Sequence, residues 1–554
     1  MTSRLWTKTM LAGACLTALM CVSTTTVGAD AADEAVRIAS KNITDKNPDV
    51  RAKAVADLAR ANNKSGATFI MTCLATEDDG PAGWNMAESI SMLTSEEALD
   101  VVEKNVLKWN RPENLFGAFW TFLGLSQQNS ERGNAILRQA IEDSKDDDIY
   151  LRSAAIEAMA RTGRTDMAEL LLKVLKTYEE DWDEKTPIIA LTCIQASPKM
   201  TNGGDTTLRN NIVLALADIL EKSKDDRIQW FTCKALAEIT GEDTYIEARF
   251  WRWWVEMGGK KVARGDGGGD GNTVAGRDVP KFFKAAAVGK RVMFVIDISG
   301  SMQGPVTMPP PEKEPAKEDP KKEDGPVTGG KKSGKDGDDD DKEKKAEIPP
   351  PDYSKVKTKM DLAKVELIHT LKYLPDDYWF NVVIYSTGHD WIDGSNKEFV
   401  QATESNKAKF IKKVEALNWA QLTNIHGALT RGFCGNKRKS LDPNKIGKKE
   451  NNPAWDPECL RTGATTIFFL TDGTPTISDD CTDGGQVGRP GGPMIGNGRF
   501  CQPENIALDM ARMNVFRKCV INTVGIGPHD GRLLEALARM SGGEYIDRTG
   551  LAGR

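Results

Sequence analysis

Residues 291–302 read RVMFVIDISGSM, and this stretch decides the fold of the second half of the chain. Its apolar run is typical of a parallel strand that is buried on both faces. Asp297, Ser299 and Ser301 follow the run, two residues apart. At the carboxyl end of a central strand, one carboxylate and two hydroxyls with this spacing can turn toward a single point. Such oxygen donors suit Mg²⁺, Ca²⁺ or Mn²⁺, although a plain strand-to-loop turn uses the same residue types.

Two later segments also carry carboxylate or hydroxyl side chains that could bind a cation. Residues 464–470 (ATTIFFL) predict a second buried strand, which is followed by Asp472. Thr423 lies between the two strands in LTNIHGAL (422–429), where Thr and Asn precede a helical pattern as N-cap residues do. His426 lies on the first turn of that helix, where a solvated or packed histidine is commoner than a metal ligand.

In this order, DISGSM, LTNIHGAL and FFLTDGTP resemble the three segments of a von Willebrand factor type A domain that form its metal-ion-dependent adhesion site. Residues 519–527 resemble the next core strand, and residues 532–545 resemble the last helix and its following turn. The resemblance covers residues 281–554 and implies an α/β, doubly wound, Rossmann-like fold. One departure concerns Gln421 and Leu422, which stand where the family usually has two glycines.

The resemblance also implies a ligand set and a mode of binding. A divalent cation, Mg²⁺ first and Ca²⁺ or Mn²⁺ as alternatives, would be bound by three hydroxyls and, directly or through water, by two carboxylates: Ser299, Ser301, Thr423, Asp297 and Asp472. Neutral hydroxyls leave the ion with unneutralised charge, so an Asp or Glu carboxylate of a protein partner can take the open position.

The first half of the chain has a helical pattern over residues 30–257. One apolar theme at positions i, i+4, i+5 and i+8 recurs over residues 50–59, 151–160, 208–217 and 228–237. Recurrence of one buried face predicts stacked helix pairs, similar to HEAT-type repeats, with a non-repetitive helical domain as the alternative. These repeats would offer a second protein-binding surface.

The composition of two further segments distinguishes them from the two folded domains. Residues 258–280 are rich in glycine and predict a flexible linker. Residues 305–356, directly after the serines, are rich in Pro, Lys, Glu, Asp and Gly, and predict a disordered insertion within the second domain. A formal net charge of −6 and a pI near 5.6 give no basic footprint for nucleic acid.

Residues 1–29 read as a secretory signal peptide: basic residues, a short apolar stretch and then small residues. No apolar run is long enough for a transmembrane helix, so we expect a periplasmic or extracellular protein. The sequence contexts of Cys15 and Cys21 do not favour lipoprotein anchoring.

Export to an oxidising compartment makes disulfides a reasonable expectation. The candidates flank two polar loops beside the expected metal face, and they pair Cys434 with Cys459 and Cys481 with Cys501.

The function expected from these observations is metal-dependent protein binding in adhesion or assembly, and not catalysis. One alternative is a structural scaffold whose helical repeats bind partners while the metal only stabilises a loop cluster. A metal-dependent hydrolase is the weaker alternative, because the chain has only four histidines, none in a zinc-binding pattern.

Overall fold

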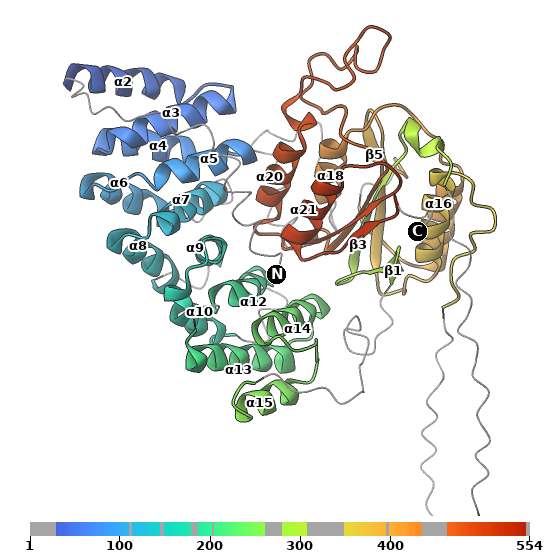
Figure 1. The fold of residues 1–554 in the computed structure, drawn as a ribbon, viewed down its shortest axis with the longest axis horizontal. Helices are drawn as coiled ribbons and strands as arrows, with labels where there is room; N and C mark the ends of the chain where they lie inside the picture. Colours follow the sequence, from blue (N-terminus) through green and yellow to red (C-terminus); the bar gives the residue numbers. More distant parts are fainter. Residues whose placement is uncertain are drawn as a thin grey trace, which may run out of the picture.

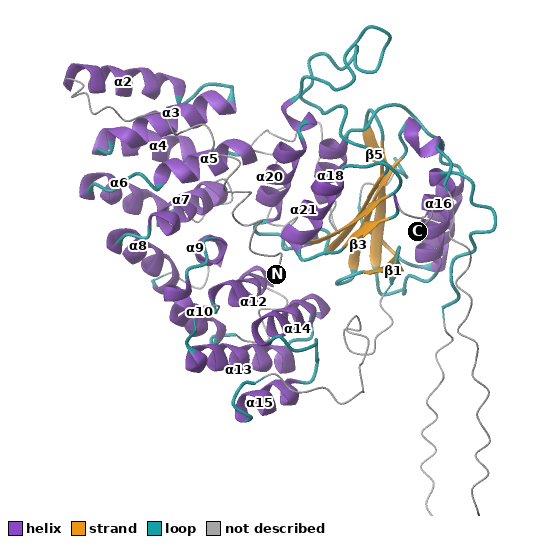
Figure 2. Cartoon of the chain, viewed as in Figure 1, coloured by secondary structure: helices purple, strands orange, loops and turns teal. Residues whose placement is uncertain are grey.

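The computed structural model describes residues 29–109, 114–143, 149–178, 187–201, 204–260, 280–306, 348–394, 398–434 and 462–549. They form a helical domain followed by an α/β domain, as the sequence predicts (Figures 1 and 2). Within these ranges, no helix has both the length and the apolar character needed to cross a bilayer. The expected signal peptide and most of the expected linker and insertion lie outside the described residues.

The helical domain consists of two rows of stacked helices that curve around one side of the α/β domain (Figure 1). The inner row contains α3 (Pro48–Ala61), α5 (Gly80–Ile90), α7 (Leu115–Gln128), α9 (Ile149–Arg161), α12 (Pro187–Met200) and α14 (Asp226–Thr240). The outer row contains α2 (Ala29–Asn42), α4 (Lys64–Leu74), α6 (Glu96–Val106), α8 (Glu131–Glu142), α10 (Ala168–Leu175), α13 (Thr206–Lys222) and α15 (Ala248–Glu256).

The recurring apolar theme falls on helices α3, α9, α13 and α14, and most of its apolar residues are buried, as expected. However, α13 and α14 are consecutive helices that lie in opposite rows. The theme therefore marks a helix with a wide buried face, whichever row it occupies, and does not mark one fixed place in a repeating unit. Stacked helix pairs are present, whereas membership of the HEAT class stays a prediction.

The α/β domain is built on one mixed sheet with the order β5-β4-β3-β7-β8-β9. Its parallel strands are β3 (Arg291–Asp297), β4 (Trp379–Tyr385), β7 (Thr466–Thr471), β8 (Val520–Gly525) and β9 (Tyr545–Asp547). Two short strands, β5 (His389–Trp391) and β6 (Val400–Gln401), pair antiparallel with β4. A small hairpin of β1 (Lys281–Phe282) and β2 (Ala285–Ala286) precedes β3. The chain starts in the middle of the sheet and builds outward on both sides, which is doubly wound topology.

Helices cover both faces of the sheet, which explains the continuous apolar runs at residues 292–296 of β3 and 467–470 of β7. One face packs on α16 (Lys359–Lys372) and α17 (Glu404–Glu415), and receives Phe294 and Phe468, whose rings stack at 5.5 Å. The other face packs on α18 (Ile425–Cys434), α20 (Pro503–Asn514) and α21 (Gly531–Ser541), and receives Val295 and Phe469.

The two domains share an apolar core. Val515 and Phe516, just after α20, are each 1% exposed and belong to the buried cluster of the helical domain. The ring of Phe516 lies 5.8 Å from Phe116 and 6.1 Å from Tyr150. Burial of this kind excludes water from the contact. The α20 face of the α/β domain therefore packs against the inner row of helices.

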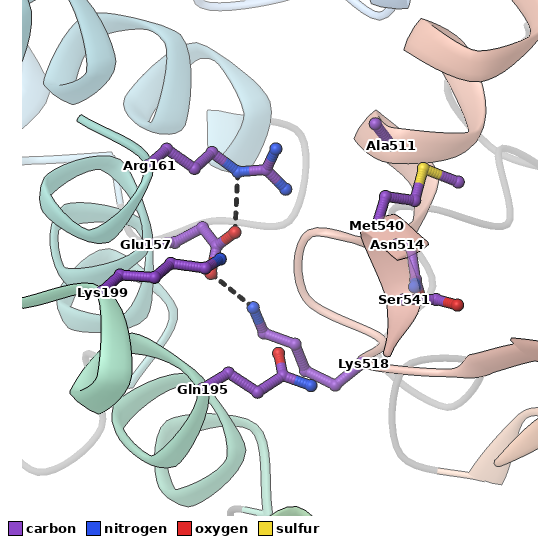
Figure 3. A pocket seen from close by; sticks show the side chains of 9 residues that line it. All are labelled: Glu157, Arg161, Gln195, Lys199, Ala511, Asn514, Lys518, Met540 and Ser541. Carbon is purple, nitrogen blue, oxygen red and sulfur yellow. Dashed lines mark hydrogen bonds and ion pairs between the residues drawn. The ribbon is translucent and has the colours of Figure 1, made fainter. Parts of the chain in front are cut away.

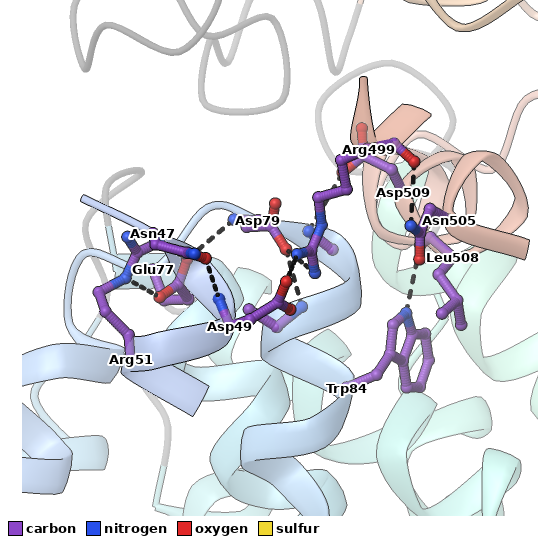
Figure 4. Close-up of polar contacts among 12 residues, drawn as sticks. Asn47, Asp49, Arg51, Glu77, Asp79, Trp84, Arg499, Asn505, Leu508 and Asp509 are labelled. Atoms are coloured by element: carbon purple, nitrogen blue, oxygen red, sulfur yellow. Dashed lines mark hydrogen bonds and ion pairs between the residues drawn. The ribbon is translucent and has the colours of Figure 1, made fainter. Parts of the chain in front are cut away.

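Polar contacts add to this interface near the N-terminal helices (Figure 4). The indole N–H of Trp84 donates to the carbonyl of Leu508 at 3.2 Å. Arg499 forms ion pairs with Asp49 and with Asp79. The segment that connects β7 to α20 is therefore tied to the first helices of the chain.

Candidate metal centre

The predicted ligands on the two central strands lie together at one edge of the sheet. Asp297 is the last residue of β3, and Ser299 and Ser301 follow in the turn and in a short 3₁₀ helix, Gly300–Gln303. Asp472 directly follows β7, which pairs with β3. The chain reverses its winding direction between β3 and β7, so the cluster occupies the switch point, where open α/β sheets bind ligands.

Direct hydrogen bonds connect these oxygens. Ser301 Oγ donates to Asp472 Oδ1 at 2.6 Å, and Ser299 Oγ lies 3.1 Å from Ser301 Oγ. Asp297 is fully buried and accepts from the Ser299 amide and from the Thr471 hydroxyl, both at 2.7 Å. The structure thus brings four of the predicted residues into one hydrogen-bonded cluster.

Thr423 approaches the cluster from the loop before α18. A Cβ atom placed on Gly473 would lie 3.8 Å from Thr423 Oγ1 and 4.0 Å from Ser301 Oγ, so the two hydroxyls border the same small space. The Thr423 amide donates to Thr476 Oγ1 at 2.8 Å, which fixes the loop to the segment after β7. All five predicted residues therefore meet at this edge, and their role as ligands stays a prediction.

Leu422 adopts a glycine-like backbone conformation at the position where the family usually has a glycine. Its φ angle is +50°, in the left-handed region that glycine adopts easily and that costs a branched side chain about 1–2 kcal/mol. The loop therefore keeps a glycine-like backbone, and the Leu422 side chain packs close to Gly488. The backbone at Leu422 is therefore strained.

Lys359 is the residue that sequence reasoning missed. Its ammonium donates to Asp472 Oδ2 at 2.7 Å, and the two side chains are 11% and 0% exposed. Lys359 is the first residue of α16 and lies between Thr358 and Asp361, which form the capping box of this helix. The capping box is visible in the sequence, but nothing in it shows that the Lys359 side chain reaches the far strand.

The two carboxylates of the cluster are electrostatically unequal. Burial, together with the nearby charge of Asp472, raises the pKa of Asp297 to about 6, although hydrogen bonds from Ser299 and Thr471 oppose the shift. Asp472 instead has the ammonium of Lys359 beside it. Asp297 therefore lies in a site that favours a further positive charge.

His426 and Asn424 belong to neighbouring networks. His426 Nε2 lies 3.0 Å from Asp509 Oδ2, and its ring stacks on Phe500 at 3.8 Å. Asn424 Oδ1 accepts from the Gly427 amide at 2.9 Å, as an N-cap does, and its amide donates to Asp479. His426 is thus a packed residue, as expected, and it faces α20.

The second cysteine pair lies in the loop between the cluster and the helical domain. Cys481 Sγ and Cys501 Sγ are 3.3 Å apart, in contact but beyond the bonded distance of about 2.05 Å. Cys459 lies outside the described residues, and nothing is described of the Cys434 side chain. Both disulfides stay predictions, which peptide mapping without reduction tests.

The strand order and the two-sided helix cover define a doubly wound α/β domain, and the oxygen cluster gives it a candidate cation site. Within the described residues, no three Asp, Glu, His or Cys side chains converge on one point, so hydroxyls would have to complete the ligand set. Two carboxylates with hydroxyls are hard donors and fit Mg²⁺ or Mn²⁺.

Among solved structures, the chain is similar to a von Willebrand factor type A protein from Catenulispora acidiphila, at 15% identity over 48% of this chain. The match spans 41% of that protein's length and has a TM-score of 0.26, which is too low to carry any argument. No protein-family model and no curated protein matches the sequence. The fold therefore rests on the strand order and the helix placement.

Proposed function

We propose that the α/β domain binds a divalent cation at the oxygen cluster and uses it to bind a protein partner through an Asp or Glu carboxylate. The observation that carries this proposal is the convergence of Asp297, Ser299, Ser301 and Asp472 at the switch point. A divalent cation held there would offset the buried Asp297 carboxylate, and because Lys359 already offsets Asp472, the site would keep excess positive charge for an acidic ligand. We also propose that the protein is exported and acts in adhesion or assembly.

Lys359 affects how strongly a cation can bind at the cluster. Its ammonium neutralises Asp472 and lies beside the turn after Ser301, because Gly304 and Gly527 border its side chain. A divalent ion that uses Asp472 directly would compete with this ammonium for the same carboxylate oxygens. Binding would then be weaker than in a site without an internal cation, unless Asp472 acts through water.

The test is calorimetry with Mg²⁺ and Mn²⁺ on the wild-type chain and on Asp297→Asn, with circular dichroism as the folding control. We expect saturable binding by the wild type and a loss of at least about tenfold in affinity in the variant, because a charged group at the ion is removed. Equal titration curves for the two proteins would refute the proposed site.

Partner capture is tested separately with immobilised wild type and Asp297→Asn in the presence of Mg²⁺ or of chelator. We expect an acidic partner to be retained only by the wild type with Mg²⁺. Exposed Asp377, which pairs with Lys290 away from the cluster, offers a matched control as Asp377→Asn.

A scaffold function is the second candidate, and the ion pair between Lys359 and Asp472 favours it. With an internal ammonium in place, the loop cluster has a counter-charge without metal. In that case the chain binds partners through its helices, and capture is the same in Mg²⁺ and in chelator. Absence of catalysis is part of both proposals; a hydrolase would need a group that activates water.

A further inference from the structure

A polar cavity lies between the two domains. Its wall combines side chains of α9, α12, α20 and α21 with Lys518 from the turn before β8 (Figure 3). The charged members are Glu157, Arg161, Lys199 and Lys518. Three cations therefore surround a single carboxylate at a place where both domains contribute.

Glu157 is already saturated by two of these cations. Its carboxylate accepts from Lys518 Nζ at 2.6 Å and from Arg161 Nε at 2.7 Å. Burial opposes the charged form, yet Lys518, Arg161 and Lys199 together hold the pKa of Glu157 well below its usual range. The carboxylate is thus ionised, and its single charge offsets only one of the three positive charges.

Lys199 is the third cation, and it has no direct partner among the residues that the structure describes. Within the described part of the chain, its ammonium makes no hydrogen bond or ion pair, and the carboxylates of Glu157 and, more weakly, Glu238 act on it only at longer range. It keeps accessible surface because it borders the open cavity, although surrounding protein is close enough for desolvation to lower its pKa. Its exposed ammonium is therefore available to bind an anion in the cavity.

The other two cations are held in fixed orientations. Arg161 stacks over the rings of Trp84 and Phe119, at 5.2 and 5.6 Å, and in Figure 3 the end of its guanidinium extends past Glu157 toward the α/β domain. Lys518 has a φ angle of +53°, so its backbone is strained where its side chain enters the cavity. Rigid donors of this kind lose little entropy when a ligand binds.

We propose that this cavity binds a small, doubly charged oxyanion such as phosphate or sulfate, which bridges the helical domain and the α/β domain. Arg161 supplies planar N–H donors, and Lys199 and Lys518 supply ammonium donors, which together match the oxygens of a tetrahedral anion. Gln195, Asn514 and Ser541 complete a lining without acidic groups other than Glu157. The anion balances the excess charge.

The experiment measures thermal unfolding and calorimetric binding of the full chain with sodium phosphate, sodium sulfate and sodium acetate against sodium chloride at matched ionic strength. We expect a saturable rise in Tm with phosphate and sulfate, and none with acetate beyond that with chloride. Lys199→Gln should raise the half-saturating concentration at least about tenfold, because one charge is lost from the site. The result is independent of divalent metal, so it is measured in chelator.

The matched control is Lys173→Gln, since Lys173 is a surface lysine of α10 that pairs with Glu142. It should titrate as wild type does. Gln195→Glu is the second variant, which adds a negative charge to the wall and should weaken binding without removing a lysine. No saturable response in the wild type, or the same response in Lys199→Gln and Lys173→Gln, would overturn the proposal.

Discussion

The chain buries two aspartates in two different ways. Asp509, on α20 at the domain interface, has a permanent cation beside it: Arg512 Nε donates to it at 2.8 Å, and His426 Nε2 lies 3.0 Å from its carboxylate. Burial opposes its charge, but Arg512 and His426 hold the pKa of Asp509 well below its usual range. Asp297 accepts only from neutral donors and has its pKa raised to about 6. The Asp509 carboxylate is thus paired within the protein, whereas the Asp297 carboxylate has no cation hydrogen-bonded to it among the described residues.

The largest effect should come from Asp509→Asn. It would leave Arg512 buried without a counter-charge and would weaken the bond from the Gly80 amide to Asp509 Oδ1. We expect a loss of about 3–5 kcal/mol in the free energy of unfolding, measured with urea. Asp297→Asn, measured in chelator, should lose none, because it removes repulsion with Asp472. Similar losses in both variants would contradict the distinction between the two sites.

The pH dependence of the two sites should have opposite sign. The folded-state pKa of Asp297 is about 6, above the ordinary 3.8, so the folded protein binds this proton more tightly than the unfolded chain. Its contribution to stability is therefore present below about pH 4 and lost as pH rises through about 6, by about 3 kcal/mol in total. Asp509 contributes stability above about pH 4 that is lost on acidification.

Urea unfolding in chelator between pH 4.5 and pH 8, on wild type and Asp297→Asn, isolates the Asp297 contribution by difference. We expect the difference curve to fall with rising pH and to flatten when Mg²⁺ is added, because a bound cation stabilises the charged form. A difference curve that rises with pH would show that the Asp297 carboxyl is not perturbed in the direction given above.

Lys359→Met should have a smaller effect, and one that depends on metal. In chelator, Asp472 would keep only the hydroxyl of Ser301, and the chain should lose about 2 kcal/mol. Mg²⁺ should restore this stability and should bind more tightly than to wild type, since its competitor is gone. Arg512→Met is the matched control at the interface, where Mg²⁺ should restore nothing. Tm values with and without Mg²⁺ decide between these outcomes.

The smallest effect concerns the loop before Thr423. Leu422→Gly relieves about 1 kcal/mol of backbone strain but loses the packing against Gly488. Leu422→Ala loses the same packing and keeps most of the strain. We therefore expect Leu422→Gly to be the more stable of the two by about 1 kcal/mol, by chemical unfolding. The reverse order would mean that the left-handed backbone at Leu422 carries no cost.

Sequence reasoning located the sheet edge because buried parallel strands and the polar residues after them are local signals. The apolar runs before Asp297 and Asp472 each indicate a strand that is buried on both faces. The order of these strands along the chain then predicts where the switch point of the sheet lies. Cap chemistry predicts a helix start at Thr423 and Asn424, and α18 begins at the next residue, Ile425.

The remaining features depend on contacts between distant segments, which no local pattern encodes. Lys359 reaches Asp472 across more than a hundred residues, and Phe516 enters the core of the other domain. The sequence does not predict the shared core, because two apolar residues after a helix, such as Val515 and Phe516, are also common within a single domain. Gly80 shows the same limit: a Cβ there would lie 2.6 Å from Asp509 Cα, a closeness that only the assembled interface creates.

The shared core also has a mechanical consequence. A pulling force applied at the oxygen cluster would pass along β3 and β7 into the sheet. It would also pass along the segment from Asp472 to Arg499, which forms ion pairs with Asp49 and Asp79 near the first helices (Figure 4). Because Val515 and Phe516 lock the two domains together between these routes, traction on this face is shared by both domains. Under such a force the helical domain would support the sheet as a rigid body and would not extend.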